Sequence, residues 1–74
     1  MMHAFTAVYE RDGAWWIGYV EELPGANSQG KTIEEVRRNL KEAVELILDA
    51  NKKLARRESR GRRVIREELK IATS

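Results

Sequence analysis

The chain has 74 residues, of which 42% are hydrophobic and 35% are charged, and its net charge is +2. This length allows one small domain, expected to span residues 1–74, and excludes a multidomain enzyme. The absence of cysteine excludes a disulfide framework and a thiolate zinc site. Because so short a chain buries only about 60% of its unfolded surface, we expect it to gain stability by forming a homo-oligomer.

The sequence gives no sign of membrane insertion or export. No apolar run approaches the roughly 20 residues that a membrane-spanning helix needs. Residues 1–6 lack the charged-then-apolar pattern of an export signal. We therefore expect a cytoplasmic protein that does not associate with membranes.

A β-hairpin is predicted at the start of the chain. Residues 3–10 and 14–21 are rich in β-branched and aromatic side chains and flank Asp12-Gly13, a strong hairpin signal. This turn is expected to pair Tyr9 with Trp16, and cross-strand partners share a face. Both faces of the hairpin are then apolar, so we expect each to be covered. One face carries Phe5, Ala7, Tyr9, Trp16, Gly18 and Val20, and the other carries Thr6, Val8, Trp15, Ile17 and Tyr19.

A third strand and a long helix are predicted next. Leu23-Pro24-Gly25 ends the second strand, because proline cannot donate to a ladder, and residues 26–30 suffice for a short strand. Thr32 and Glu35 form a capping-box pattern that predicts a helix from Ile33 to about Leu54. Its apolar stripe contains Ile33, Val36, Leu40, Ala43, Val44, Ile47, Ala50 and Leu54.

The end of the chain is predicted to contain a last strand. Arg60-Gly61-Arg62 breaks the helical pattern, and residues 66–72 alternate as a strand does, although they also suit a helix. The expected fold is therefore α+β with the order β-β-β-α-β: a three-stranded antiparallel sheet, one long helix and a C-terminal strand.

Charge is distributed unevenly along the chain. Residues 1–31 and 32–51 each carry a net charge of −2, whereas residues 52–74 carry +6. The basic helix end and linker, at about residues 52–63, can meet phosphates or an acidic protein surface. The alternative is a solvated helix end, and the segment has no aromatic residue for base stacking. The candidate nucleic-acid contacts are Lys52, Lys53, Arg56, Arg57, Arg60, Arg62 and Arg63.

No residue set predicts catalysis or a cofactor. Residues 25–32 match the Walker A pattern, but that loop needs parallel strands on both sides, and Asp49, the candidate acidic partner, falls within the predicted helix. His3 is the only histidine and stands near a terminus. We therefore expect no catalytic, cofactor-binding or metal-binding residue, and a protein that is not an enzyme.

The stretch from Trp16 to Ile47 resembles the HicB family of antitoxins. An aromatic strand, a Leu-Pro-Gly corner, a Gly-x-Thr step and a helix that opens with Glu-Glu occur in the order and spacing of that family. The resemblance implies a partial RNase H-like fold. It also implies a HicA-type toxin, an mRNA-cleaving ribonuclease, as the partner that the chain neutralises. The residues that carry this motif structurally are Leu23, Pro24, Gly25, Gly30, Thr32 and Glu35.

The apolar hairpin faces point independently to an interaction role. We hypothesise that Phe5, Tyr9, Trp16 and Val20 meet the helix, although the reverse assignment of faces stays open. The contact surface for another subunit or the toxin is then formed by Val8, Trp15, Ile17 and Tyr19. Because the sequence ends at Ser74, we expect it to lack the DNA-binding domain that many HicB relatives append. The alternative function is a small nucleic-acid-binding protein that uses the basic C-terminal segment.

Overall fold

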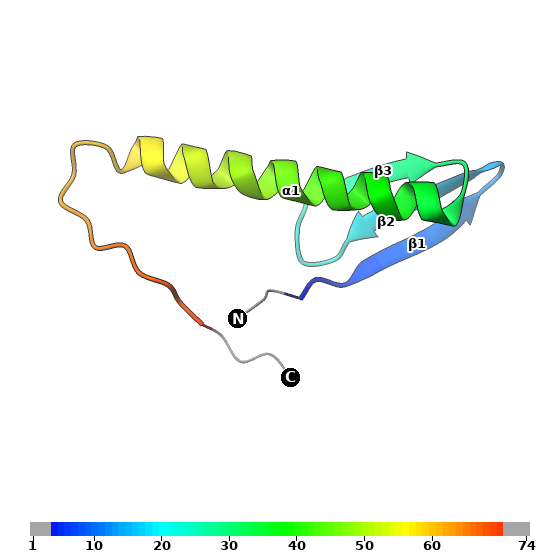
Figure 1. Cartoon of the computed structure of the whole chain (residues 1–74), viewed down its shortest axis with the longest axis horizontal. Coiled ribbons are helices and arrows are strands. Elements are labelled where there is room, and N and C mark those ends of the chain that lie inside the picture. The colour runs from blue at the N-terminus through cyan, green and yellow to red at the C-terminus, as the bar shows by residue number, and fades with distance from the viewer. Residues whose placement is uncertain (1–3, 71–74) are drawn as a thin grey trace.

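The computed structural model describes residues 4–70, which form a three-stranded antiparallel sheet and one long helix (Figure 1). The strands are β1 (Ala7–Asp12), β2 (Trp15–Val20) and β3 (Asn27–Gly30), in the order β1-β2-β3. The helix, α1 (Ile33–Glu58), lies across one face of the sheet, and its last turns extend beyond it. The predicted α+β class, with three antiparallel strands and one helix, is confirmed.

The hairpin forms at the predicted place, but its register differs from the prediction by two residues. The expected pairing of Tyr9 with Trp16 was wrong. A slip of one residue would move every side chain to the opposite face, whereas a slip of two leaves each on its predicted face. The observed pairs include Ala7 with Val20, Tyr9 with Gly18, and Arg11 with Trp16.

The register follows from the conformation of the turn. Asp12 pairs with Trp15, so the loop residues are Gly13 and Ala14 rather than Asp12 and Gly13. Of these two, Gly13 has a positive φ of 62°, and Ala14 does not. A positive φ at the first loop residue alone is typical of a type II′ turn. A turn centred on Asp12-Gly13 would instead require a positive φ at Asp12, which costs energy in a residue with a Cβ.

β3 begins after a tight turn built from the Leu-Pro-Gly corner. The N–H of Ala26 donates to the carbonyl of Leu23 at 3.1 Å, and the N–H of Val20 donates to the carbonyl of Ala26 at 3.0 Å. These bonds fold the chain back so that Ala26 is buried just before β3. The predicted third strand is confirmed, and the residues of the Leu-Pro-Gly corner form the turn that precedes it.

α1 begins at Ile33, as predicted. The N–H of Glu35 donates to the Thr32 hydroxyl at 3.1 Å, which satisfies one of the free donors of the first turn. The helix continues to Glu58, one turn beyond the expected end at Leu54, because residues 55–58 are good helix formers. Ser59 follows, and its N–H donates to the carbonyl of Ala55 at 3.1 Å.

The core occupies only the first half of α1. Its buried apolar residues are Val20, Ala26, Val36 and Leu40, and Tyr9, Leu23, Val44 and Ile47 pack partly buried around them. Ala50 and Leu54 belong to the predicted apolar stripe but are exposed, because the sheet does not reach that far along the helix. Within residues 4–70, no helix is long and apolar enough to cross a membrane.

α1 packs mainly against β3 and β2, away from β1. Gly30 permits this, because a Cβ at that position would lie 2.8 Å from the backbone nitrogen of Val36. The Asn39 side-chain amide also donates to the carbonyl of Gln29 at 3.0 Å. The helix is therefore held to one side of the sheet.

The strand expected at residues 66–72 is not formed in the part that the structure describes. Residues 63–70 adopt neither helix nor strand, and residues 71 and 72 lie outside the described range. A strand needs a neighbouring edge with which to pair, and this segment follows the overhanging end of α1. Its large apolar side chains, Val64, Ile65 and Leu69, are consequently exposed.

We predict that Gly30→Ala destabilises the fold by about 1–3 kcal/mol, because the added methyl group forces α1 away from β3. Urea denaturation measures this loss. Gln29→Ala is the matched control, since its side chain is exposed and the backbone carbonyl that accepts from Asn39 is kept. Equal stability of Gly30→Ala and the wild type would contradict the close approach of the helix.

Candidate functional site

The sheet face opposite α1 is uncovered among the described residues, and we call it the open face. It carries the β1 and β2 side chains that alternate with the helix-facing ones: Val8, Glu10, Asp12, Trp15, Ile17 and Tyr19. Gly18 identifies the helix side, because a Cβ there would lie 3.1 Å from the Val36 side chain. Phe5, Tyr9, Trp16 and Val20 accordingly share the helix side, as hypothesised. An uncovered apolar sheet face is suited to contact with another protein.

The predicted contact residues form one patch on the open face. Tyr19 pairs with Val8, and Ile17 lies between Trp15 and Tyr19 on the same face of β2. Trp15 and Tyr19 are 41% and 39% exposed, while Val8 and Ile17 are half-buried. Whether this patch contacts a subunit or the toxin stays a prediction.

Charged groups border the patch. Glu10 pairs with Ile17, and Asp12 pairs with Trp15, so two carboxylates line its β1 side. At the other side, the Lys31 ammonium lies 5.8 Å from the centre of the Trp15 ring, a cation–π contact. The open face therefore has an apolar centre and a charged rim, the usual anatomy of a protein–protein contact.

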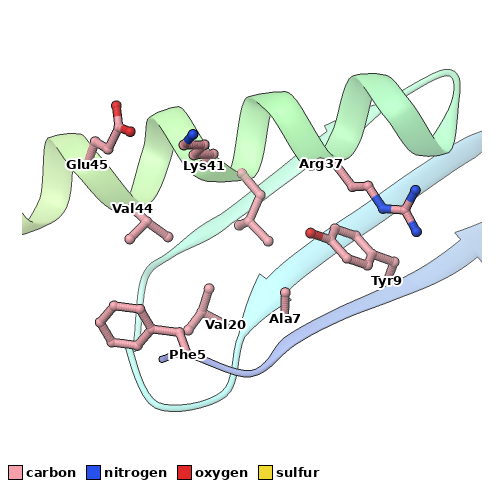
Figure 2. Close-up of a pocket in the computed structure, with 9 residues that line it drawn as sticks. Phe5, Ala7, Tyr9, Val20, Arg37, Lys41, Val44 and Glu45 are labelled. Carbon is pink, nitrogen blue, oxygen red and sulfur yellow. The ribbon is translucent and has the colours of Figure 1, made fainter. Parts of the chain in front are cut away.

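A second surface is the groove between β1 and α1, which we call the β1 groove. It has a volume of about 360 Å³ (Figure 2). Phe5, Ala7, Tyr9 and Val20 form its sheet side, and the helix contributes Arg37, Leu40, Lys41, Val44 and Glu45. Figure 2 shows Phe5 and Val44 at one end and Tyr9 with Arg37 at the other. The Arg37 guanidinium carbon lies 5.7 Å from the centre of the Tyr9 ring.

Sequence reasoning missed the β1 groove. The apolar stripe of α1 and the apolar face of β1 were both recognised, and they were expected to pack together. The groove exists because α1 is displaced toward β3, and that displacement depends on Gly30 and Asn39. The only sequence signal was the pair of basic residues, Arg37 and Lys41, that flanks the apolar stripe.

Glu22 ties the start of β1 to the turn after β2. Its carboxylate accepts from the Thr6 hydroxyl at 2.6 Å and from the Thr6 N–H at 2.7 Å. The hydrogen bond from the Thr6 hydroxyl, and to a smaller extent the bond from the Thr6 N–H, lower the pKa of Glu22. Both bonds stabilise the ionised carboxylate. Glu22 is thus engaged within the chain and serves to anchor β1.

The Walker-like stretch, residues 25–32, has no phosphate-binding geometry. It contains antiparallel β3, whereas that loop requires a parallel strand on each side. The space beside Gly30 is filled by Val36 and Glu35. Asp49 lies within α1 and forms an ion pair with Lys53 at 3.0 Å. Within residues 4–70, no group of three or more acidic or histidine side chains is placed to hold a metal ion.

The basic residues do not gather into one compact site. Lys52, Lys53, Arg56 and Arg57 lie on the overhanging end of α1, and Arg60, Arg62 and Arg63 follow in the turn and the segment after it. All seven are exposed. They form an extended positive surface remote from both the open face and the β1 groove.

Comparison with known proteins shows the family to which this chain belongs. The UPF0150-like family model matches residues 1–54, so the chain belongs to this family. A UPF0150 protein of Thermotoga maritima is 45% identical over 47 residues, which cover 61% of this chain and 63% of that protein. UPF0150 proteins of Synechocystis sp. and Helicobacter pylori are 43% and 50% identical, over 66% and 58% of this chain and 69% and 60% of their own lengths. No solved structure matches the chain.

The shared region has clear bounds. The chain spans less than two thirds of the Thermotoga and Helicobacter proteins. The family match ends at residue 54, so it includes the sheet and most of α1 but not the segment after the helix. The open face and the β1 groove both lie within the matched region.

We predict that Thr6→Val raises the pKa of Glu22, because the larger of its two hydrogen-bond contributions is lost. A carboxylate whose pKa is lowered by folding stabilises the fold above its unfolded pKa, and this stabilisation is lost as pH falls through its folded pKa. Thr6→Val should therefore lower stability at neutral pH but not at a pH below the folded pKa. NMR titration of the Glu22 carboxyl carbon, with urea denaturation at both pH values, measures these effects.

Thr6→Ser is the matched control for this prediction. It keeps the hydroxyl group that donates to Glu22, so the pKa of the carboxyl should stay near its wild-type value. An unchanged pKa in Thr6→Val would show that the hydroxyl bond does not form in solution.

Proposed function

We propose that this chain is a non-catalytic, HicB-like antitoxin module that forms a homo-oligomer in the cytoplasm and neutralises a HicA-type mRNA-cleaving toxin. The observation that carries the proposal is the open face, an apolar patch with a charged rim on a chain that belongs to the UPF0150-like family. The Leu-Pro-Gly corner, the Gly-x-Thr step and the Glu-Glu helix start add the HicB resemblance.

The geometry supports a role in binding. An exposed apolar patch is costly in water, so its presence on one face favours a partner that covers it. Trp15 and Tyr19 are the residue types that most often dominate the binding energy of protein interfaces. Glu10 and Asp12 beside them suit a partner with a basic surface, as a protein that binds RNA has.

The finer fold assignment belongs to the same proposal. A partial RNase H-like fold requires a fourth strand after α1, and residues 66–72 are the stretch with the matching alternation. We propose that this strand forms when the chain assembles with another molecule. The exposed position of Leu69 supports this, since packing of one face of the strand against the helix would remove its side chain from water.

We predict that Ile17→Asp lowers the affinity for a purified HicA-type ribonuclease at least tenfold, because it places a charge in the centre of the patch. The assay measures RNA cleavage by the toxin at increasing concentrations of the antitoxin, and circular dichroism confirms that the variant is folded. Trp15→Ser provides a second variant at a more exposed position.

Leu46→Asp is the control for the open-face variants. Leu46 is an exposed apolar residue of α1 outside the patch, so the same charge there should leave inhibition unchanged. Full inhibition by Ile17→Asp and Trp15→Ser would exclude the open face as the toxin contact. If the wild-type chain does not inhibit the toxin at all, the antitoxin proposal is wrong.

The alternative function, nucleic-acid binding, is supported by the exposed positive surface at residues 52–63. Under the antitoxin proposal, we predict that the double variant Arg56→Glu, Arg57→Glu inhibits the toxin as well as the wild type does. Fluorescence anisotropy with labelled RNA, measured over a range of salt concentrations, tests the alternative. Tight binding that falls steeply with salt and is lost in this variant would favour the nucleic-acid function.

A further inference from the structure

We propose that the open edge of β1 and the β1 groove receive residues 63–70 of a second copy of the chain as an added strand. We call these residues the C-terminal segment. Two copies then exchange their segments reciprocally and form a two-fold symmetric dimer. This inference deepens the proposed homo-oligomer, on which it rests, and names the contact through which the oligomer forms. It leaves the apolar patch of the open face, Val8, Trp15, Ile17 and Tyr19, available for the toxin.

The outer edge of β1 has backbone groups suited to a further strand. The N–H of Glu21 donates to the carbonyl of Thr6 at 3.0 Å, which places Thr6, Val8, Glu10 and Asp12 in hydrogen-bonded pairs with β2. In an antiparallel ladder the alternate residues direct their N–H and carbonyl groups to the other side. The backbone groups of Ala7, Tyr9 and Arg11 therefore point away from the sheet, and β1 is the terminal strand on that side.

The two edges of the sheet are not equivalent. At the β3 edge, the Asn39 side chain donates to the outward carbonyl of Gln29, so α1 occupies that edge. At the β1 edge, α1 is displaced and the β1 groove lies between the helix and the strand. An extended segment can pair with a strand edge while alternate side chains enter a pocket, a common mode of peptide recognition. The β1 edge provides both features.

The C-terminal segment fits the dimensions of the β1 groove. Ile65, Glu67 and Leu69 project from one face of an extended chain, and the first and last are about 13 Å apart. The helical wall from Arg37 to Val44 is about 10 Å long. Ile65 and Leu69 are 92% and 75% exposed in the single chain, so their apolar side chains are available for the two ends of the groove.

Charges match on both faces of the added strand. Between Ile65 and Leu69, the carboxylate of Glu67 lies opposite Lys41 in the middle of the helical wall, whichever direction the segment runs. The alternate side chains Arg66, Glu68 and Lys70 then project toward the open face beside Glu10 and Asp12 of β1, and two of these three are opposite in charge to those carboxylates. A segment of this sequence is thus complementary to β1 as well as to the helix.

The C-terminal segment begins at the overhanging end of α1 and turns back beneath the helix (Figure 1), but residues 63–70 form no ladder with β1 of their own chain. The Arg66 guanidinium donates to the Ser59 hydroxyl at 2.9 Å, and the Ser59 hydroxyl donates to the carbonyl of Arg56 at 3.1 Å. Ser59 lies 15 residues after Val44, which stands at one end of the β1 groove. This separation is about 22 Å along a helix. This contact keeps the start of the segment at the overhanging end of α1 (Figure 1), where a second copy can reach it.

We predict that Glu67→Lys raises the dissociation constant of the dimer at least tenfold, as measured by analytical ultracentrifugation of the full chain. Glu68→Lys is the matched control: it introduces the same charge at the adjacent, oppositely directed position, and it should not weaken the dimer. Lys41→Glu combined with Glu67→Lys should restore dimerisation to within about fivefold of the wild type. An effect of Glu68→Lys equal to that of Glu67→Lys, or no restoration in the combined variant, would overturn the contact.

Cross-linking distinguishes exchange between two copies from folding of the segment back onto its own chain. Because the natural chain has no cysteine, any disulfide must join the introduced residues. A mixture of Ala7→Cys chains with Leu69→Cys chains, or with Ile65→Cys chains if the segment runs in the other direction, should form a disulfide-linked pair on mild oxidation, whereas Ala7→Cys mixed with Leu46→Cys should not. In the double variant Ala7→Cys, Leu69→Cys, a cross-link within one chain and a monomeric mass would overturn the exchange. Toxin inhibition that survives in monomeric Glu67→Lys would leave the proposed antitoxin function intact, so the two proposals fail separately.

Discussion

The structure depends on the way in which one helix is held against a sheet that is apolar on both sides. α1 is anchored over β3 and β2, because Gly30 allows its backbone to approach the strand and Asn39 bonds to the outward carbonyl of Gln29. A helix is about 10 Å wide, and the outer strands of a three-stranded sheet are themselves about 10 Å apart. Displacement toward β3 therefore leaves the helix-facing side of β1 partly uncovered.

Two surfaces of different kinds result from this single constraint. The open face is a continuous side of the sheet, and its apolar patch is the kind of surface that suits a folded protein partner. The β1 groove lies between α1 and β1, a terminal strand of the sheet, so it suits an extended chain. Under the two proposals, the toxin covers the apolar patch and the second copy fills the groove, and both use the carboxylates of Glu10 and Asp12 between them.

The elements were predictable from the sequence because their signals are local. The turn glycine, the Leu-Pro-Gly corner and the Thr32 cap each act over a few residues, and alternation assigned the side chains to the correct faces. The register was not predictable, since Asp12-Gly13 and Gly13-Ala14 both allow a tight turn. The β1 groove was not predictable either, because it arises from the lateral position of α1, which depends on contacts with β3 made across the fold.

The last part of the chain shows the limit of local reasoning most clearly. The alternation at residues 66–72 predicts a strand, yet residues 63–70 of the single chain are irregular. A strand is defined by its neighbour, and β1 is a terminal strand of the described sheet, on the far side of the groove from the helix. The segment starts at the overhanging end of α1, where the Arg66 guanidinium donates to the Ser59 hydroxyl, and residues 63–70 form no ladder with that edge. The exchange proposal accounts for this, because it supplies the partner of the strand from another copy, which reaches the segment at the same overhang that leaves Leu54 without a sheet to cover it.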